Sequence, residues 1–176
     1  MVTSLVILGA IVAALAVFFF SLFPLARGAI WVPSTSEKAE LLAALCEAGP
    51  GERAADLGAG DGRVVIALAR RGAEAHGFEV NPLLVVAARW NIRRAGVGDH
   101  AFIHWKSFWR ADLSGFTAIT IFQGSAVMRR LEAKLRRELV SGARVVSDYW
   151  GFPTLPPVRI YGTVYCYRIG ASVWEA

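Results

Sequence analysis

A glycine-rich stretch, DLGAGDG at residues 56–62, constrains the fold of this chain more than any other feature. An aspartate ends an apolar run, and three glycines at alternate positions separate it from an apolar segment typical of a helix. Glycines in such a turn let the backbone leave a strand sharply and approach a ligand where a side chain would collide. The helix that follows presents unpaired N–H groups to a polar cofactor. The stretch therefore predicts a strand, a cofactor-binding turn and a helix.

Strand-like and helix-like segments alternate from Arg53 onward. A repeated order of strand, helix and strand requires parallel strands with helical crossovers. We therefore predict an α/β fold, a Rossmann-like sandwich with a mostly parallel sheet. The expected strands end near residues 57, 79, 105, 122 and 150, and the expected helices cover about 62–71, 83–96 and 125–140.

The two ends of this unit have patterns of their own. Residues 158–169 alternate around a Gly162-Thr163 turn, which predicts a terminal antiparallel hairpin. Before the first strand, Ser34 and Glu37 stand at capping-box spacing, so a helix is expected to begin there and cover the sheet. Three leucines predict its buried stripe: Leu41, Leu42 and Leu45.

The segment 125–140 has the pattern of an amphipathic helix. Its predicted buried face consists of Val127, Leu131, Leu135 and Leu139. Five basic residues predict a solvated face: Arg129, Arg130, Lys134, Arg136 and Arg137. On this face Glu132 and Arg136 are spaced i, i+4 and are expected to pair. Contact of this face with anionic lipid is a second interpretation. We expect no nucleic acid partner, because the chain has no recognition-helix or RNA-binding signature.

Residues 2–26 contain no charged side chain. At a rise of ~1.5 Å per residue, a helix of this length crosses the roughly 30 Å hydrocarbon core of a bilayer. A cleaved signal peptide is disfavoured, because no positive n-region precedes the apolar run and no clear cleavage site follows it. We predict a transmembrane anchor over 1–27 and a catalytic domain over 28–176. This anchor predicts a single-pass membrane protein. No Lys or Arg precedes Arg27, so the positive-inside rule predicts that the domain lies on the cytoplasmic side.

The cysteines and histidines show no metal-binding pattern. Cys46 and Cys166 lie far apart without CxxC spacing, which predicts buried thiols in a reduced compartment. The three histidines lack cysteine or carboxylate neighbours at ligand spacing, and we predict no metal site.

Acidic residues around the glycine turn distinguish between nucleotide cofactors. Glu79 ends the second expected strand, 23 positions after Asp56, the separation expected for an acid that reaches ribose hydroxyls. A dinucleotide turn, GxGxxG, would need glycine where the chain has Arg63. Asp61 would repel a pyrophosphate but could receive the α-amino group of a methionine moiety. These features favour S-adenosylmethionine (SAM) over a dinucleotide.

Several strings resemble one enzyme family when taken in order: DLGAGDGRVVIALARRG, GFEVNP and LEAKLRRELVSGARVVS. They are similar to the membrane-anchored class I lysine methyltransferases related to the ATP synthase c-subunit lysine N-methyltransferase. The resemblance covers roughly residues 28–169 and implies methyl transfer from SAM to a lysine of a membrane protein. It also implies roles for individual residues: a SAM loop of Asp56, Gly58, Gly60 and Gly62, a ribose contact at Glu79, Asn81 beside the adenosine, and Thr35 over the methionine end.

The chain departs from this family at one position. The family's Lys-Asp-Leu-Trp string corresponds to Lys106, Ser107, Phe108 and Trp109, so Ser107 replaces the aspartate that receives the adenine amino group. A serine hydroxyl forms this hydrogen bond without charge assistance, and either cofactor affinity falls or Asp112 compensates. Ser107 and Phe108 remain expected cofactor neighbours.

The acceptor leaves few marks in the sequence. Residues 122–125 lack the [N/D]PP[Y/F] tetrapeptide that is typical of enzymes methylating amide or base nitrogens. Expected acceptor contacts are Trp109, Gln123 and Tyr149, and no catalytic base is identified. Two alternatives stay open: an acceptor that is a lipid or a small hydrophobic molecule, and an inactive domain that serves as an interaction module.

Overall fold

The structure is a computed structural model that describes residues 6–7, 9–11 and 35–170. Most of the predicted membrane segment, together with Pro33 and Ser34, lies outside the described residues. Among the described residues, no helix is both long enough and apolar enough to cross a membrane. The transmembrane anchor therefore stays a prediction.

A seven-stranded sheet forms the centre of the domain, with strand order β3-β2-β1-β4-β5-β7-β6. The first five strands run parallel, and β7 pairs antiparallel with both β5 and β6. The predicted α/β sandwich and terminal hairpin are therefore confirmed. The strands are β1 Arg53–Leu57, β2 Glu74–Glu79, β3 Ala101–Trp105, β4 Ala118–Ile121, β5 Arg144–Asp148, β6 Arg159–Tyr161 and β7 Val164–Arg168.

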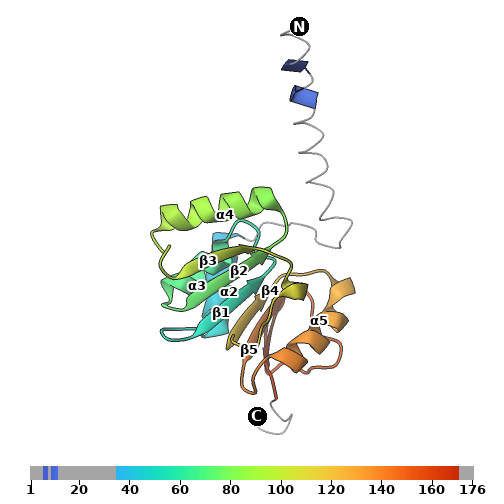
Figure 1. Cartoon of the computed structure of the whole chain (residues 1–176). Helices are drawn as coiled ribbons and strands as arrows, with labels where there is room; N and C mark the ends of the chain where they lie inside the picture. The colour runs from blue at the N-terminus through green and yellow to red at the C-terminus, as the bar shows by residue number, and fades with distance from the viewer. Residues whose placement is uncertain (1–5, 8, 12–34, 171–176) are drawn as a thin grey trace.

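Helices cover the sheet on both faces (Figure 1). They are α2 Ser36–Cys46, α3 Arg63–Arg70, α4 Pro82–Ala95 and α5 Ser125–Glu138, with a 3₁₀ turn, η2, at Phe108–Arg110. One buried cluster unites α2, α3 and α4 with one face of the sheet, and a second cluster unites α5 with the other face. Successive residues of β1 show this division, because Ala54 belongs to the first cluster and Ala55 to the second.

Two strands end earlier than the sequence predicts. β4 ends at Ile121 instead of Phe122, and β5 ends at Asp148 instead of Trp150. Tyr149 has a φ of 71°, a left-handed conformation that leaves the extended path of β5. This bend ends the strand directly after a buried aspartate.

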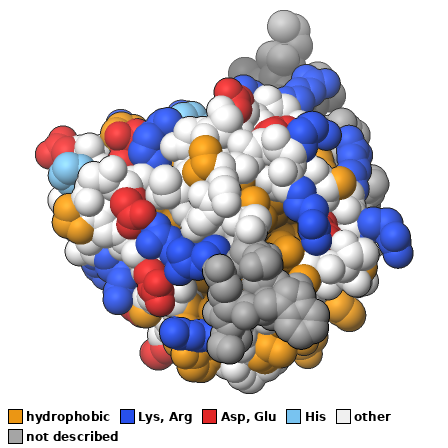
Figure 2. Space-filling view, turned by 90° about the horizontal axis from the view of Figure 1, so that it is seen from below, with side chains coloured by type: hydrophobic (Ala, Val, Ile, Leu, Met, Phe, Trp, Pro, Cys, Tyr) orange, Lys and Arg blue, Asp and Glu red, His pale blue; other side chains and the backbone are white. Residues whose placement is uncertain are grey.

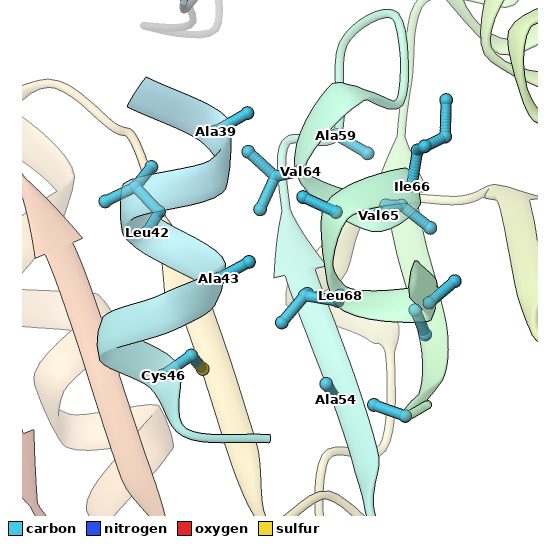
Figure 3. Close-up of a cluster of buried hydrophobic side chains, with 14 of the residues drawn as sticks. Ala39, Leu42, Ala43, Cys46, Ala54, Ala59, Val64, Val65, Ile66 and Leu68 are labelled. Carbon is cyan, nitrogen blue, oxygen red and sulfur yellow. The ribbon is translucent and has the colours of Figure 1, made fainter. Parts of the chain in front are cut away.

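The buried stripe of α2 differs from the predicted one. Leu42 is buried as expected, but Leu41 is 40% exposed and Leu45 is partly buried. Alanines occupy the rest of the inner face, and Figure 3 shows Ala39 and Ala43 directed toward α3. The helix also begins later than the capping-box spacing predicted, because Thr35 is the N-cap and its hydroxyl accepts a hydrogen bond from the Lys38 N–H (3.2 Å).

The inner face of α5 also differs in part from the prediction. Leu131, Leu135 and Leu139 are buried as expected, but Met128 takes the place of Val127 in the core. The predicted Glu132–Arg136 pair is present at 3.0 Å. Lys134 was predicted on the solvated face and is buried: its ammonium donates to the Ala111 carbonyl (2.7 Å) and to the Glu138 carboxylate (2.6 Å). A buried ammonium needs such partners to offset its desolvation.

Ion pairs connect the amino ends of the strands. Arg53 and Glu74 join β1 to β2 at 2.9 Å, and Arg144 pairs with Glu52. Acidic and basic side chains are interspersed over the face seen from below in Figure 2. Cys46 and Cys166 are buried and form no disulfide, as expected for buried thiols.

Two adjacent leucines provide a matched test of the α2 packing. Replacing Leu42, which is 1% exposed, with alanine is expected to lower the free energy of unfolding by about 2–5 kcal/mol. The same change at Leu41 removes mostly solvated atoms and is expected to cost less than about 1 kcal/mol. Denaturant unfolding of both variants measures the difference. Equal losses would contradict the packing of α2 described above.

Candidate cofactor site

The loop after β1 adopts a conformation that depends on its glycines. Gly58, Gly60 and Gly62 have positive φ angles of 97°, 55° and 84°. The Gly58 and Ala59 N–H groups both donate to the Phe78 carbonyl, at 3.0 and 3.1 Å. A Cβ atom on Gly58 would clash with Gln123 Nε2. The loop therefore follows the sharp path that the sequence predicts and is fixed to the end of β2.

The Glu79 carboxylate joins this loop to the carboxyl end of β2. One oxygen accepts a hydrogen bond from the Gly60 N–H (3.0 Å), and the other accepts from the N–H groups of Val80 and Asn81 (both 2.7 Å). The side chain is buried. An ionised carboxylate has about four lone-pair sites, so three backbone donors leave room for one ribose hydroxyl. This arrangement is compatible with the ribose contact predicted for Glu79.

Asp56 lies at the end of β1, buried beside the loop. Its Oδ1 accepts a hydrogen bond from the Thr120 hydroxyl (2.7 Å), and the two residues are opposite each other in the β1–β4 register. Burial raises the pKa of Asp56 to about 7, and the negative charge of Glu79 acts in the same direction, while the Thr120 hydrogen bond opposes them. Two acidic side chains therefore share this edge of the sheet.

Asp61 and Asn81 make contacts within the protein. Asp61 pairs with Arg63 (2.8 Å), and its carbonyl accepts a hydrogen bond from the Asn91 side chain (2.9 Å). The Asn81 side chain caps α4 by accepting from the Leu83 N–H (3.0 Å). The proposed contacts of Asp61 with a methionine amino group and of Asn81 with adenosine stay predictions.

Ser107 and Phe108 lie just beyond β3. The preceding Lys106 N–H donates to the Glu79 carbonyl (3.0 Å), so this loop begins at the same edge as the carboxylate. Ser107 is the N-cap of η2, and its hydroxyl accepts from the Trp109 N–H at 3.4 Å. Asp112, the possible substitute for the missing aspartate, is exposed and accepts from the Ser114 N–H (3.0 Å).

The three expected acceptor contacts have different surroundings. The Gln123 amide donates to the Leu57 carbonyl (2.8 Å), so this side chain lies against the loop after β1. The ring of Trp109 packs on Phe108, and the Arg130 guanidinium lies 4.4 Å from its centre. Tyr149 is 60% exposed at the end of β5. Thr35, expected over the methionine end of the cofactor, is exposed and caps α2.

A buried polar group lies at the end of β5. Asp148 is buried, and its Oδ1 accepts hydrogen bonds from the Lys38 ammonium (3.0 Å) and the Thr163 hydroxyl (2.7 Å). Lys38 also donates to Thr163 (3.0 Å). Alternation within β5 does not by itself fix the direction of the Asp148 side chain, and neither Lys38 nor Thr163 stands in a recognisable motif. Their pairing joins α2, β5 and the hairpin turn, which no local pattern reveals.

His76 of β2 and His104 of β3 are in contact with each other. His76 Nδ1 lies 2.9 Å from His104 Nε2, and His76 Nε2 lies 2.8 Å from the Glu74 carboxylate. Burial lowers the pKa of His104, and the positive charges around it act in the same direction. Within the part of the chain that the structure describes, no group of three His, Cys, Asp or Glu side chains could hold a metal ion.

Comparison with known proteins identifies the family. The pattern of the ANTKMT methyltransferase domain matches residues 56–159, which include the loop, Glu79 and the end of β5. The chain belongs to this methyltransferase family. It is 39% identical to the ATP synthase c-subunit lysine N-methyltransferase of Xenopus laevis over 66% of this chain and 53% of that protein. It is 37% identical to the adenine nucleotide translocase lysine N-methyltransferase of Mus musculus over 81% of this chain and 62% of that protein.

A solved structure supports the cofactor prediction. An RNA methyltransferase from Salinibacter ruber in complex with S-adenosyl-L-homocysteine matches with a TM-score of 0.75 and 32% identity, over 82% of this chain and 98% of that chain. The resemblance to class I methyltransferases and the prediction of SAM as cofactor are therefore confirmed. The chain spans only part of the length of the two curated lysine methyltransferases named above: 53% of the first and 62% of the second.

Gly58 and Gly96 provide a matched test of the loop, because both have positive φ angles. Changing Gly58 to alanine would force Gln123 away from Leu57 and strain a backbone with a φ of 97°. The loop relieves such strain by leaving this conformation, so SAM affinity is expected to fall at least about tenfold, or ~1.4 kcal/mol. A Cβ on Gly96 meets no atom within 4 Å, so Gly96→Ala should bind SAM normally. Titration calorimetry compares the two variants, and equal affinities would contradict this role of Gly58.

The raised pKa of Asp56 predicts a specific pH dependence of stability. A carboxyl with a raised pKa binds its proton more tightly in the folded state, so its contribution is present at low pH and is lost as pH rises through the folded-state pKa. The unfolding free energy of the wild type, relative to Asp56→Asn, is expected to fall between about pH 4 and pH 7. The slope is at most about 1.4 kcal/mol per pH unit. Denaturant unfolding across this range measures it, and a constant difference would contradict the assigned burial of the charge.

Proposed function

We propose that this chain is a membrane-anchored methyltransferase that transfers a methyl group from SAM to a lysine amine of a membrane protein. The observation that carries the enzyme class is the glycine loop closed on the Glu79 carboxylate within a domain of the methyltransferase family. The curated relatives described above are named as lysine N-methyltransferases, which supports lysine as the acceptor.

The anchor and its orientation belong to the same proposal. Residues 2–26 carry no charge, and their length suits a single membrane span. The first basic residue is Arg27, which favours a catalytic domain on the cytoplasmic side. An anchored enzyme searches for a membrane-embedded acceptor in two dimensions, which raises the effective concentration of that acceptor.

The residues at the strand ends suit methyl transfer to an amine. SAM supplies an electrophilic methyl group on a sulfonium, and the protein must hold the neutral amine in line with it. Tyr149 and Trp150 are 60% and 43% exposed beside the buried Asp148. Their rings offer apolar surface to the methylene chain of a lysine, and removal of water from its ammonium favours the neutral form.

One observation favours a second acceptor class. The solved structure from Salinibacter ruber, which this chain covers almost completely, is described as an RNA methyltransferase. A lipid or a small hydrophobic acceptor, and an inactive interaction module, also remain as alternatives. A single labelling experiment separates these four outcomes.

We expect the full chain, incubated with tritiated SAM, native membranes and total RNA, to label membrane protein. Acid hydrolysis should then release labelled methyllysine. Asp56→Ala is expected to lower labelling at least about tenfold, because the change removes a buried group beside the cofactor loop. Leu41→Ala, a half-exposed position on α2, serves as the active control.

The other outcomes would each replace the proposal. Label in RNA or in the organic phase would move the acceptor to those classes. Failure of the wild type to exceed the Asp56→Ala variant in any fraction would favour the interaction module.

A further inference from the structure

Helix α4 has an apolar face directed away from the sheet. Val85, Ala88 and Ile92 are buried against the domain. On the opposite side, Leu83, Val86 and Trp90 are 52%, 66% and 56% exposed. Their spacing of three and four residues places them in one row. In Figure 1 the helix lies along the upper edge of the domain, with no other described helix or strand on its outer side.

The charges on α4 all have the same sign. Between Val80 and Gly98 the chain has three arginines, Arg89, Arg93 and Arg94, and no acidic residue. All three are exposed. The Arg94 guanidinium lies 4.4 Å from the centre of the Trp90 ring, whereas Arg89 donates to the Ile103 carbonyl of β3 (3.2 Å). The opposite face of the domain differs, because acidic and basic side chains are interspersed there (Figure 2). The outer side of α4 therefore combines a row of apolar side chains with arginines, and it has no acidic side chain.

We infer that α4 is a membrane-docking helix, which lies on an anionic bilayer surface with Leu83, Val86 and Trp90 in the interface. A helix with an apolar row that includes tryptophan, next to arginines, suits the boundary between acyl chains and anionic headgroups. A second copy of the chain fits this face less well. Symmetric pairing through α4 would bring the arginines of both copies together.

The position of α4 gives this contact a consequence for the cofactor site. The helix begins at Pro82, three residues after Glu79, and its capping residue Asn81 donates its N–H to the Glu79 carboxylate. The apolar end of α4 is thus next to the carboxyl edge of the sheet. Docking through α4 holds that edge at the bilayer surface. This docking is a second membrane contact beside the proposed N-terminal anchor, and it does not depend on that anchor.

The experiment places one environment-sensitive dye at Val86 through the change Val86→Cys. The two native thiols leave this label specific: Cys46 is 0% exposed, burial raises its pKa to about 12, and Cys166 is 8% exposed. Reactive cysteines need accessible thiolates. Val140→Cys is the matched control, because Val140 is another exposed valine (50%), two residues after the end of α5.

The full chain is reconstituted in vesicles of phosphatidylcholine with or without phosphatidylserine, and nitrobenzoxadiazole emission is recorded. We expect a blue shift, a several-fold gain in intensity and protection from iodide at position 86, all increased by phosphatidylserine. Position 140 should stay accessible to water. The double change Arg93→Glu and Arg94→Glu should abolish the effect of phosphatidylserine.

Three results would overturn the inference. Emission typical of water at position 86 in both vesicle types would show that α4 is not docked. A shift that does not respond to phosphatidylserine would indicate another cover, such as the chain's own N-terminal segment. A shift that grows with the protein-to-lipid ratio would indicate a second copy. The anchor is scored separately by retention of the chain in vesicles after an alkaline wash.

Discussion

The geometry of the cofactor site depends on the Glu79 carboxylate. Its two oxygens bind three backbone N–H groups, one from the loop after β1 and two from the segment that leads into α4. The loop is also fixed to β2, because the Gly58 and Ala59 N–H groups donate to the Phe78 carbonyl. A neutral or shorter side chain at this position would leave buried donors unpaired, at a cost of roughly 1–3 kcal/mol for each.

Close packing beneath the loop sets its height above the sheet. A Cβ atom on Gly77 in β2 would lie 2.6 Å from both Ala59 Cβ and Ile103 Cδ1. Only glycine therefore lets the loop and its helix approach the strand this closely. With the loop held low, two acidic side chains, Asp56 and Glu79, end at one edge of the sheet. A cofactor with a cationic sulfonium and an amino group suits this edge, because a nearby positive charge favours the ionised form of both carboxyls.

Much of the fold was predictable because its signals are local. The glycine turn, the alternation of strands and helices and the Gly162-Thr163 turn each lie within a few residues, and the structure has all of them. Pairings across the sheet were not predictable. Thr120 lies opposite Asp56 only because β4 crosses to the far side of β1, and sequence periodicity contains no register between strands.

The burial of individual helix residues was also hard to predict from the sequence. Ala39 and Ala43 carry little hydrophobic signal, yet they are buried where α2 meets α3, while the larger Leu41 is half-exposed. Lys134 looks like a surface residue in sequence and is buried because a carbonyl and a carboxylate happen to receive its ammonium. In both cases the partner, which comes from another element or another turn, decides the burial.

For the membrane-anchored enzyme that we propose, the group formed by Lys38, Asp148 and Thr163 would limit the distance between the catalytic edge and the membrane. It fastens the first turn of α2 to the end of β5, so this helix cannot swing away and lengthen the connection to the N-terminal segment. Arg27 and Thr35 are eight positions apart, and even a fully extended chain of that length spans at most about 28 Å. For an anchor that ends at Arg27, an acceptor lysine must therefore project only a short distance above the bilayer. The length of this connection would therefore select acceptor lysines by their distance from the bilayer surface.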